Sequence, residues 1–226
     1  MTKKPTFRRF FAYIIDIVII SFIVTAFSSI KYLNPKLDEY NDYSEQYKSY
    51  VTEMSQTNPT AIINDKKVEE LAYNVSYAGV YTSLISLVVS FLYFCVFQYY
   101  TNGKTVGKLL MGIYVVSADE KRLKISQTII RSSIVDSLLT SALSLIALLF
   151  LARAPYMSIS RVIEIVDLGL VLACIGMVIY RDDGVGLHDK LAKTRVVLKN
   201  KEHNIIKEAI VTEKKKSTKK TKKEEE

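Results

Sequence analysis

Five ionisable side chains stand inside or beside long apolar stretches of this 226-residue chain. They are Asp16, Arg131, Asp136, Glu164 and Asp167. A charge at the centre of a lipid bilayer costs about 3 kcal/mol or more, so such groups face a bundle interior or water. The chemistry expected of them is the binding of an ion or a proton by a buried carboxylate, or a fixed pairing of carboxylate with arginine.

The apolar residues gather in four blocks separated by polar stretches, a pattern typical of membrane spans. At about 1.5 Å per residue, each block is long enough to cross about 30 Å of hydrocarbon. The sequence therefore predicts an all-α integral membrane protein with four transmembrane helices, over residues 10–30, 75–97, 129–152 and 162–180. The alternative, a soluble protein with buried helices, is disfavoured by blocks of this length.

The first block follows a basic stretch, as in a signal peptide, but it is longer than a signal-peptide core and contains Asp16. No clear cleavage motif follows, so we expect an uncleaved span. Residues 1–200 are expected to form one membrane domain. Residues 201–226 are low-complexity and rich in lysine, which predicts a disordered cytoplasmic tail.

The distribution of basic residues predicts the orientation. Residues 1–9 carry four basic and no acidic residues, and residues 98–128 carry five basic against two acidic. The segment 31–74 carries five basic against eight acidic, whereas the chain from Arg181 onward carries fourteen against nine. Both termini and the 98–128 loop are therefore expected in the cytoplasm, with 31–74 outside. The short link 153–161, with two arginines, is the exception.

The polar segments also carry structural signals. Apolar residues at helical spacing predict an amphipathic helix over 36–56, and a second helix from about Lys66 is expected to run straight into the second span. These would form an outer helical hairpin, the alternative being a partly ordered loop. Short strands of a small cytoplasmic sheet are predicted over residues 113–116, 123–126 and 194–199.

Several kinds of site are not expected. The run GKTVGK places three residues between Gly103 and Gly107, where a P-loop needs four, and no Ser or Thr follows Lys108. The two cysteines lie inside apolar blocks and are expected to be packing residues, and the two histidines form no metal-ligand pattern. No metal, cofactor or nucleic-acid partner is expected.

The buried charges suggest a network. Arg9 and Asp16 share a helix face but lie about 10 Å apart along the axis, too far for a direct ion pair. Arg131, near the cytoplasmic end of its span, is therefore the predicted counter-charge of Asp16. Asp136 lies five residues further on and about 140° around the helix. The predicted network is thus Asp16, Arg131 and Asp136.

A second acidic pair lies near the expected outer end of the fourth span. Glu164 and Asp167 are one turn apart on one face, and together they are a candidate cation site. The alternative is that residues 153–165 form an interfacial helix, so that only Asp167 is immersed. Both interpretations remain open from the sequence.

Three motifs, in order along the chain, resemble the RDD family of small bacterial membrane proteins. They are RRFFAYIIDIVI (8–19), GKTVGKLLMGIYVV (103–116) and GLHDKLAKTRVV (186–197). Lys104 replaces the family's usual glutamine and Lys193 its usual glycine, while Arg131 fits the pattern. The resemblance implies a cytoplasmic family motif made of Arg9, Gly103, Thr105, Gly107, Lys108, His188, Asp189 and Thr194. It also implies a plasma-membrane protein, in a family that usually has fewer spans.

Two functions are compatible with these features. The first is transport of ions or a small solute through the buried network, in a homo-oligomer or larger membrane complex. The resemblance adds that transport, including Na⁺/H⁺ exchange, has been attached to some family members. The second is a non-catalytic scaffold or accessory subunit in which the buried charges are structural. The lysine-rich tail is expected to touch anionic lipid or to be solvated.

Enzymatic activity is not expected. His188 and Asp189 are adjacent, and no nucleophile accompanies them. Asp189 is instead expected to accept hydrogen bonds from backbone N–H groups or from an arginine such as Arg9.

Overall fold

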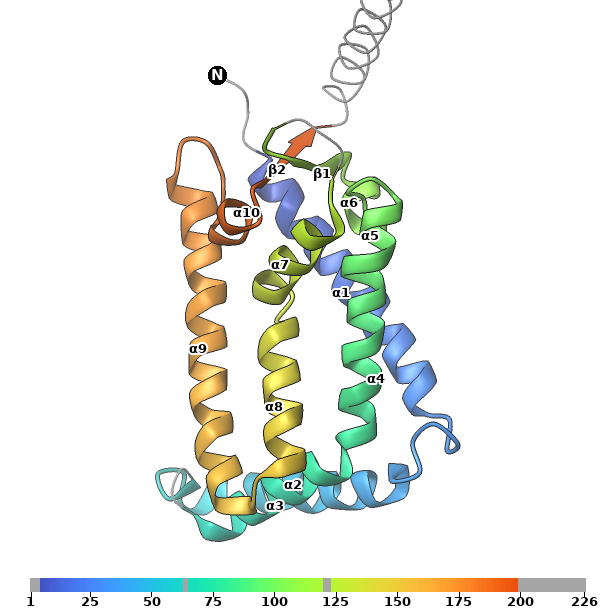
Figure 1. Ribbon diagram of the computed structural model, residues 1–226. Helices are drawn as coiled ribbons and strands as arrows, with labels where there is room; N and C mark the ends of the chain where they lie inside the picture. Colours follow the sequence, from blue (N-terminus) through green and yellow to red (C-terminus); the bar gives the residue numbers. More distant parts are fainter. Residues whose placement is uncertain (1–4, 63–64, 120–122, 199–226) are drawn as a thin grey trace, which may run out of the picture.

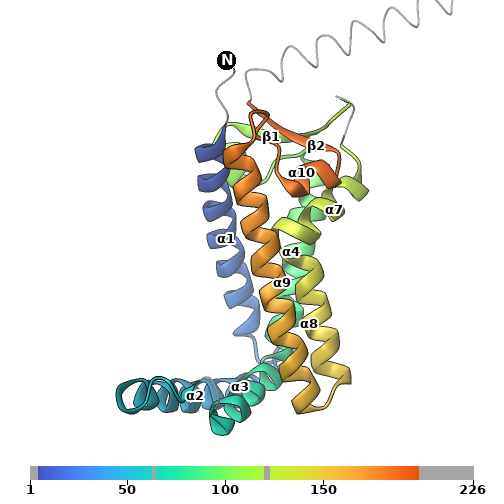
Figure 2. The ribbon, with the colours of Figure 1, turned by 90° about the vertical axis from the view of Figure 1, so that its left-hand side faces the viewer.

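The computed structural model describes residues 5–62, 65–119 and 123–198. Long apolar helices stand side by side, with a small sheet at one end and a helical hairpin that projects sideways at the other (Figures 1 and 2). They are α1 (Thr6–Ser28), α4 (Val80–Phe91), α8 (Leu138–Phe150) and α9 (Arg153–Tyr180). The predicted lysine-rich tail over 201–226 lies outside the described residues.

Three described helical stretches are long and apolar enough to cross a membrane, and a fourth qualifies if a bent helix pair counts as one span. The three are α1, Val80–Tyr100 and α9. Val80–Tyr100 is α4 continued by the π-helix η2 (Leu92–Phe97) and by α5 (Gln98–Tyr100). The predicted first span is confirmed as a continuous helix, whereas the other three differ from the prediction.

The predicted third span is broken. Residues 129–152 fall on α7 (Ile125–Val135) and α8, which meet at an angle of 69° across Asp136 and Ser137. Ser137 has a left-handed backbone, with φ of 54°. Polar side chains such as those of Asp136 and Ser137 can hydrogen-bond to the backbone in place of helical hydrogen bonds. Contacts from other helices stabilise the break. The hydroxyl of Tyr13 donates to the carbonyl of Val135 at 3.2 Å, and Ser137 donates to Asp167 at 2.9 Å.

The fourth span begins earlier than predicted. The expected link over 153–161 is helical, and α9 runs without interruption for 28 residues, about 42 Å. A separate interfacial helix over 153–165 is therefore not present. The two arginines that violate the charge rule lie near glutamates of the neighbouring helix α3, with Arg153 3.6 Å from Glu70 and Arg161 3.5 Å from Glu69.

The predicted helical hairpin is confirmed. The helices α2 (Leu37–Thr57) and α3 (Lys66–Ala78) pack together across one end of the bundle, which we call the hairpin end (Figure 1). However, α3 does not run straight into the second span. It ends at Ala78, and the chain turns at Gly79 before α4 begins, so residues 75–78 belong to the hairpin.

The opposite end, the sheet end, carries two strands instead of the predicted three. β1 (Ile113–Ser117) pairs antiparallel with β2 (Thr194–Leu198), with Val115 opposite Val196. The predicted strand over 123–126 is wrong because Ile125 begins α7, and the side chain of Gln127 accepts a hydrogen bond from the N–H of Lys124 at 3.0 Å. The short helices α6 (Val106–Leu110) and α10 (Leu187–Leu191) complete this end.

Packing is concentrated at the two ends. One apolar core joins α1 to the sheet through Ala12, Ile113, Val115, Leu123 and Val196. The other joins α8, α9 and α3 at the hairpin end through Ala147, Leu148, Tyr156 and Tyr73.

Candidate functional site

Asp16 is fully buried at the sheet end, where α1 meets α6, and three donors bind its carboxylate. The hydroxyl of Tyr93 donates to Oδ1 at 2.6 Å, and the backbone N–H of Gly107 donates to the same oxygen at 2.8 Å. The hydroxyl of Thr105 donates to Oδ2 at 2.5 Å. Hydrogen bonds of this kind stabilise a carboxylate without a cation.

Local structure places each of these donors. The π-helix η2 carries Tyr93, whose oxygen also accepts from the N–H of Val106 at 3.1 Å. Thr105 is the N-cap of α6, and Gly107 lies in its first turn. A Cβ on Gly107 would lie 2.1 Å from the carbonyl oxygen of Ala12, so only glycine lets α6 approach α1 this closely.

The predicted pairing of Asp16 with Arg131 is wrong. Among the described residues, no hydrogen bond or ion pair joins the two side chains. The neutral donors of the 103–107 segment and Tyr93 already satisfy Asp16. One sequence signal marks Tyr93: it is a tyrosine within an apolar block rather than at its end.

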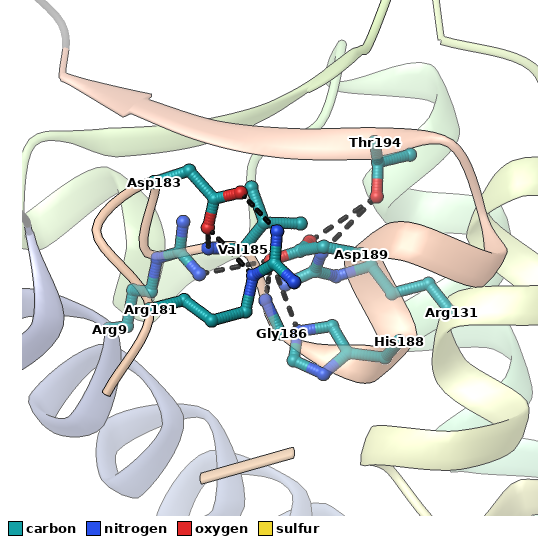
Figure 3. Close-up of polar contacts among 9 residues, drawn as sticks. All are labelled: Arg9, Arg131, Arg181, Asp183, Val185, Gly186, His188, Asp189 and Thr194. Carbon is teal, nitrogen blue, oxygen red and sulfur yellow. Dashed lines mark hydrogen bonds and ion pairs between the residues drawn. The ribbon is translucent and has the colours of Figure 1, made fainter. Parts of the chain in front are cut away.

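Arg131 belongs instead to a site around Asp189, which is 0% exposed (Figure 3). Nη1 of Arg9 donates to Asp189 Oδ2 at 3.0 Å, and Nη1 of Arg131 donates to Oδ1. Thr194 adds a hydroxyl at 3.3 Å and Gly186 a backbone N–H at 3.4 Å. The expected hydrogen bonds to Asp189 from Arg9 and from a backbone N–H are thus both present.

Two further motif residues lie buried beside these carboxylates. Burial, and then the positive charges of Arg131, Arg9 and Lys108, lower the pKa of His188 to about 2. His188 is therefore neutral near pH 7 and unsuited to proton transfer there. Burial, reinforced by the charge of Arg131, lowers the pKa of Lys108 to about 8, and its ammonium donates to Oε1 of the buried Gln98 at 2.8 Å.

Together these contacts form two junctions at the sheet end. The Asp16 junction ties α1 to η2 and α6, and the Asp189 junction ties α1 to α7, α10 and β2. Both carboxylates are buried, at 1% and 0% exposed, and each accepts three or more hydrogen bonds from protein donors, so neither is open to a ligand from solvent. Gly103, the remaining motif glycine, has φ of 83° and no room for a Cβ, which would lie 1.9 Å from the carbonyl oxygen of Val115.

Asp136 is placed differently from the other two members of the predicted network. It lies at the α7–α8 break, and among the described residues no lysine or arginine nitrogen lies within 4.0 Å of its carboxylate. It lines a crevice of about 380 Å³ to which α1, α3, α4, α8 and α9 all contribute. The polar wall of this crevice is made by hydroxyl side chains, chiefly Ser83, Ser86, Ser90, Ser141 and Ser144.

The predicted pair of Glu164 and Asp167 does not form one site. Asp167 accepts hydrogen bonds from Ser137 at 2.9 Å and Thr140 at 2.6 Å, at the N-terminus of α8. Glu164 is exposed on the outer face of α9. Among the described residues no three His, Cys, Asp or Glu side chains are grouped so as to hold a metal ion.

Comparison with known proteins adds one finding. The model of the RDD family matches residues 4–193 of this chain, a range that includes the Asp16 junction, the crevice and, apart from Thr194, the Asp189 junction. No curated protein and no solved structure matches the chain.

Replacing Gly107 with alanine is expected to destabilise the fold by about 3 kcal/mol, because the new Cβ forces α6 away from α1 and Asp16. The matched control is Gly169→Ala, where a Cβ meets no atom within 4 Å. Thermal unfolding of the purified protein measures both. Equal melting temperatures for the two variants would contradict the close approach of α1 and α6.

Asp189→Asn is expected to cost about 3–5 kcal/mol, since it leaves the buried guanidinium of Arg131 without its carboxylate. Arg131→Gln is expected to cost less, about 1.5–3 kcal/mol, since Asp189 keeps its ion pair with Arg9. Their double variant should lose much less than the sum, by at least about 1.5 kcal/mol. The combination of Asp16→Asn with Arg131→Gln should be additive within about 0.5 kcal/mol, because these residues have different partners. Unfolding free energies of the six proteins, wild type included, decide between the two pairings.

Acid is expected to destabilise the protein through His188. An unfolded histidine binds a proton below about pH 6.5, whereas folded His188 has its pKa lowered to about 2. Because only the unfolded state gains the proton, the contribution of neutral His188 to the free energy of unfolding is fully present above about pH 6.5. This contribution is lost as the pH falls below that value. The loss between pH 7 and pH 5 is about 2 kcal/mol. His188→Gln should remove that slope in unfolding measurements, and an unchanged slope would contradict the burial of a neutral imidazole.

Proposed function

This chain belongs to the RDD family, and on that premise we propose that it moves an ion or a small polar solute across a membrane. The proposal is carried by one observation. A bundle of helices that are apolar on the outside contains a hydroxyl-lined crevice with a carboxylate, Asp136, at one end. Polar groups in such a position usually mark a solute or ion pathway.

The broken helix supports this function. Many membrane transporters build their sites where a span is interrupted, because the freed helix ends provide charges and backbone groups inside the bilayer. Here α7 and α8 are interrupted at Asp136 and Ser137, and the crevice reaches this break. The role predicted for the whole Asp16, Arg131 and Asp136 network therefore passes to Asp136 alone.

We propose four spans in the plasma membrane, with α7 and α8 counted as one. The charge distribution supports cytoplasmic termini and a cytoplasmic sheet end, with the α2–α3 hairpin outside. Leu109 and Leu110 of α6 and Leu191 of α10 are exposed, which suits short helices lying in the inner interface of the bilayer.

The proposed assembly is a homo-oligomer. Apolar side chains of α9, such as Val162, Ile165 and Leu168, are exposed over much of the helix, so α9 can pack against lipid or a second copy. We propose no enzymatic activity. The neutral, buried His188 supports this, because it is not available as an acid or base near pH 7.

A scaffold or accessory subunit is the second candidate, and a different observation favours it. Asp16 and Asp189 are buried and accept hydrogen bonds that hold six elements together, which is how structural charges behave. In this case the sheet end would serve as a rigid platform for a partner, and Asp136 would be dispensable.

Flux measurements in vesicles separate the two candidates. Purified protein is reconstituted, and movement of Na⁺, K⁺, H⁺ and small amines is followed under an imposed gradient. Transport predicts that Asp136→Asn lowers the flux about tenfold or more, since the variant removes the only charge among the described residues that line the crevice. Ser133→Ala, whose hydroxyl bonds to the carbonyl of Ile129 instead of lining the crevice, is the control. Absence of flux with all four solutes would contradict transport of them and favour the scaffold.

A further inference from the structure

A positive charge close to Asp136 would be favourable because of the place of this residue at the end of its helix. Asp136 is the C-cap of α7, and its N–H donates to the carbonyl of Ser132 at 3.2 Å. A helix C-terminus carries negative partial charge, so a carboxylate there is unfavourable unless a cation lies nearby. Asp167 has the opposite situation, because it lies at the N-terminus of α8, where a negative charge is favourable.

The cations nearest to Asp136 are already engaged. Lys108 of α6 and Arg131 of α7 both act on it electrostatically, together with the carboxylate of Asp16 and the hydroxyl of Ser132. However, the ammonium of Lys108 donates to Gln98, and the guanidinium of Arg131 donates to Asp189. Neither forms an ion pair with Asp136, so the side of the carboxylate that lines the crevice can accept a cationic guest.

The serines of the crevice are also available to a guest. Ser83, Ser86 and Ser90 lie on one face of α4, and Ser141 and Ser144 lie on α8. A helical serine in apolar surroundings commonly bonds to the carbonyl one turn back, as Ser76 and Ser133 do here. None of the five crevice serines makes a side-chain hydrogen bond within the described part of the chain. Ser83 and Ser141 are exposed and Ser86, Ser90 and Ser144 are half-buried, so these hydroxyls are open to water or to a polar occupant of the crevice.

The size and shape of the crevice indicate what kind of cation fits. Its volume of about 380 Å³ lies at the lower end of the range for small-molecule sites. From Ser83 to Ser90 the hydroxyls extend over about 10 Å along α4, too far to converge on one metal ion, whose oxygen ligands lie at about 2–2.6 Å. Leucines such as Leu87 and Leu145 complete the wall and suit methylene groups.

We propose that the crevice binds a small aliphatic amine, with its ammonium group on Asp136 and its polar or hydroxyl-bearing chain along the serines of α4 and α8. This inference rests on the proposed function, because it takes the crevice as the route of the solute. It narrows the solute to a singly charged organic cation, since the described residues that line the crevice include one carboxylate and no other charge.

Equilibrium binding tests the proposal. The full-length protein in lipid nanodiscs, in a buffer free of amines, is titrated calorimetrically with 4-amino-1-butanol. The uncharged analogue 1,4-butanediol, NaCl and KCl are titrated in parallel. We expect saturable binding of the amino alcohol alone. Asp136→Asn should weaken it about tenfold or more, because it removes a charge-assisted hydrogen bond.

If Asp136→Asn folds poorly, serine variants test the same binding site instead. Ser86→Ala and Ser90→Ala should each weaken amino alcohol binding about two- to tenfold. Ser133→Ala, on the outside of α7, should leave it unchanged. Matching size-exclusion profiles confirm that the variants remain folded.

Three outcomes would overturn the inference: equal binding of the diol, binding of the amine that Asp136→Asn and Ser86→Ala do not alter, or Asp136-dependent binding of Na⁺ or K⁺ without the amine. The last result would still leave transport of an inorganic ion intact. Conversely, Asp136-dependent binding of the amine without any flux in vesicles supports the binding site and contradicts the transport function.

Discussion

The structure depends on one constraint, that a carboxylate removed from water must receive enough hydrogen bonds or positive charge to remain ionised. Asp189 meets this constraint with two arginines from different helices, and Asp16 meets it with a backbone N–H and two hydroxyls. Each set of donors comes from segments far apart in the sequence. Satisfying these two charges therefore fixes the relative positions of α1, α6, α7 and α10.

The same constraint explains why the middle of the bundle differs from its ends. The sheet end is locked by the two junctions and an apolar core, and the hairpin end by a second core around Tyr156. A crevice extends from Asp136 to Leu148 and Tyr156 of the hairpin-end core, and among the described residues no lysine or arginine nitrogen lies within 4.0 Å of its Asp136. A rigid frame at both ends leaves this region free to interact with something other than protein.

Much of the fold follows from local patterns. Hydropathy predicted the continuous first helix and the apolar blocks, and helical periodicity predicted the hairpin over 36–78 in its main features. The break at Asp136 and Ser137 was not predictable in this way, because apolar residues on both sides continue the block. It exists because Tyr13 and Asp167, from other helices, supply hydrogen bonds to the interrupted backbone and to the side chains beside it.

The sequence by itself determined which residues carry the unusual charges, because ionisable groups within apolar blocks are visible without coordinates. It also indicated that Asp189 accepts hydrogen bonds from backbone N–H groups or from an arginine such as Arg9, and both kinds of donor are present. Only the tertiary structure decided how the remaining charges are matched. Arg131 binds Asp189 rather than Asp16, and Asp136 is left facing a crevice. The physical reason is that neutral donors can satisfy a buried carboxylate as well as a cation can, and spacing along the chain does not show which donors will arrive.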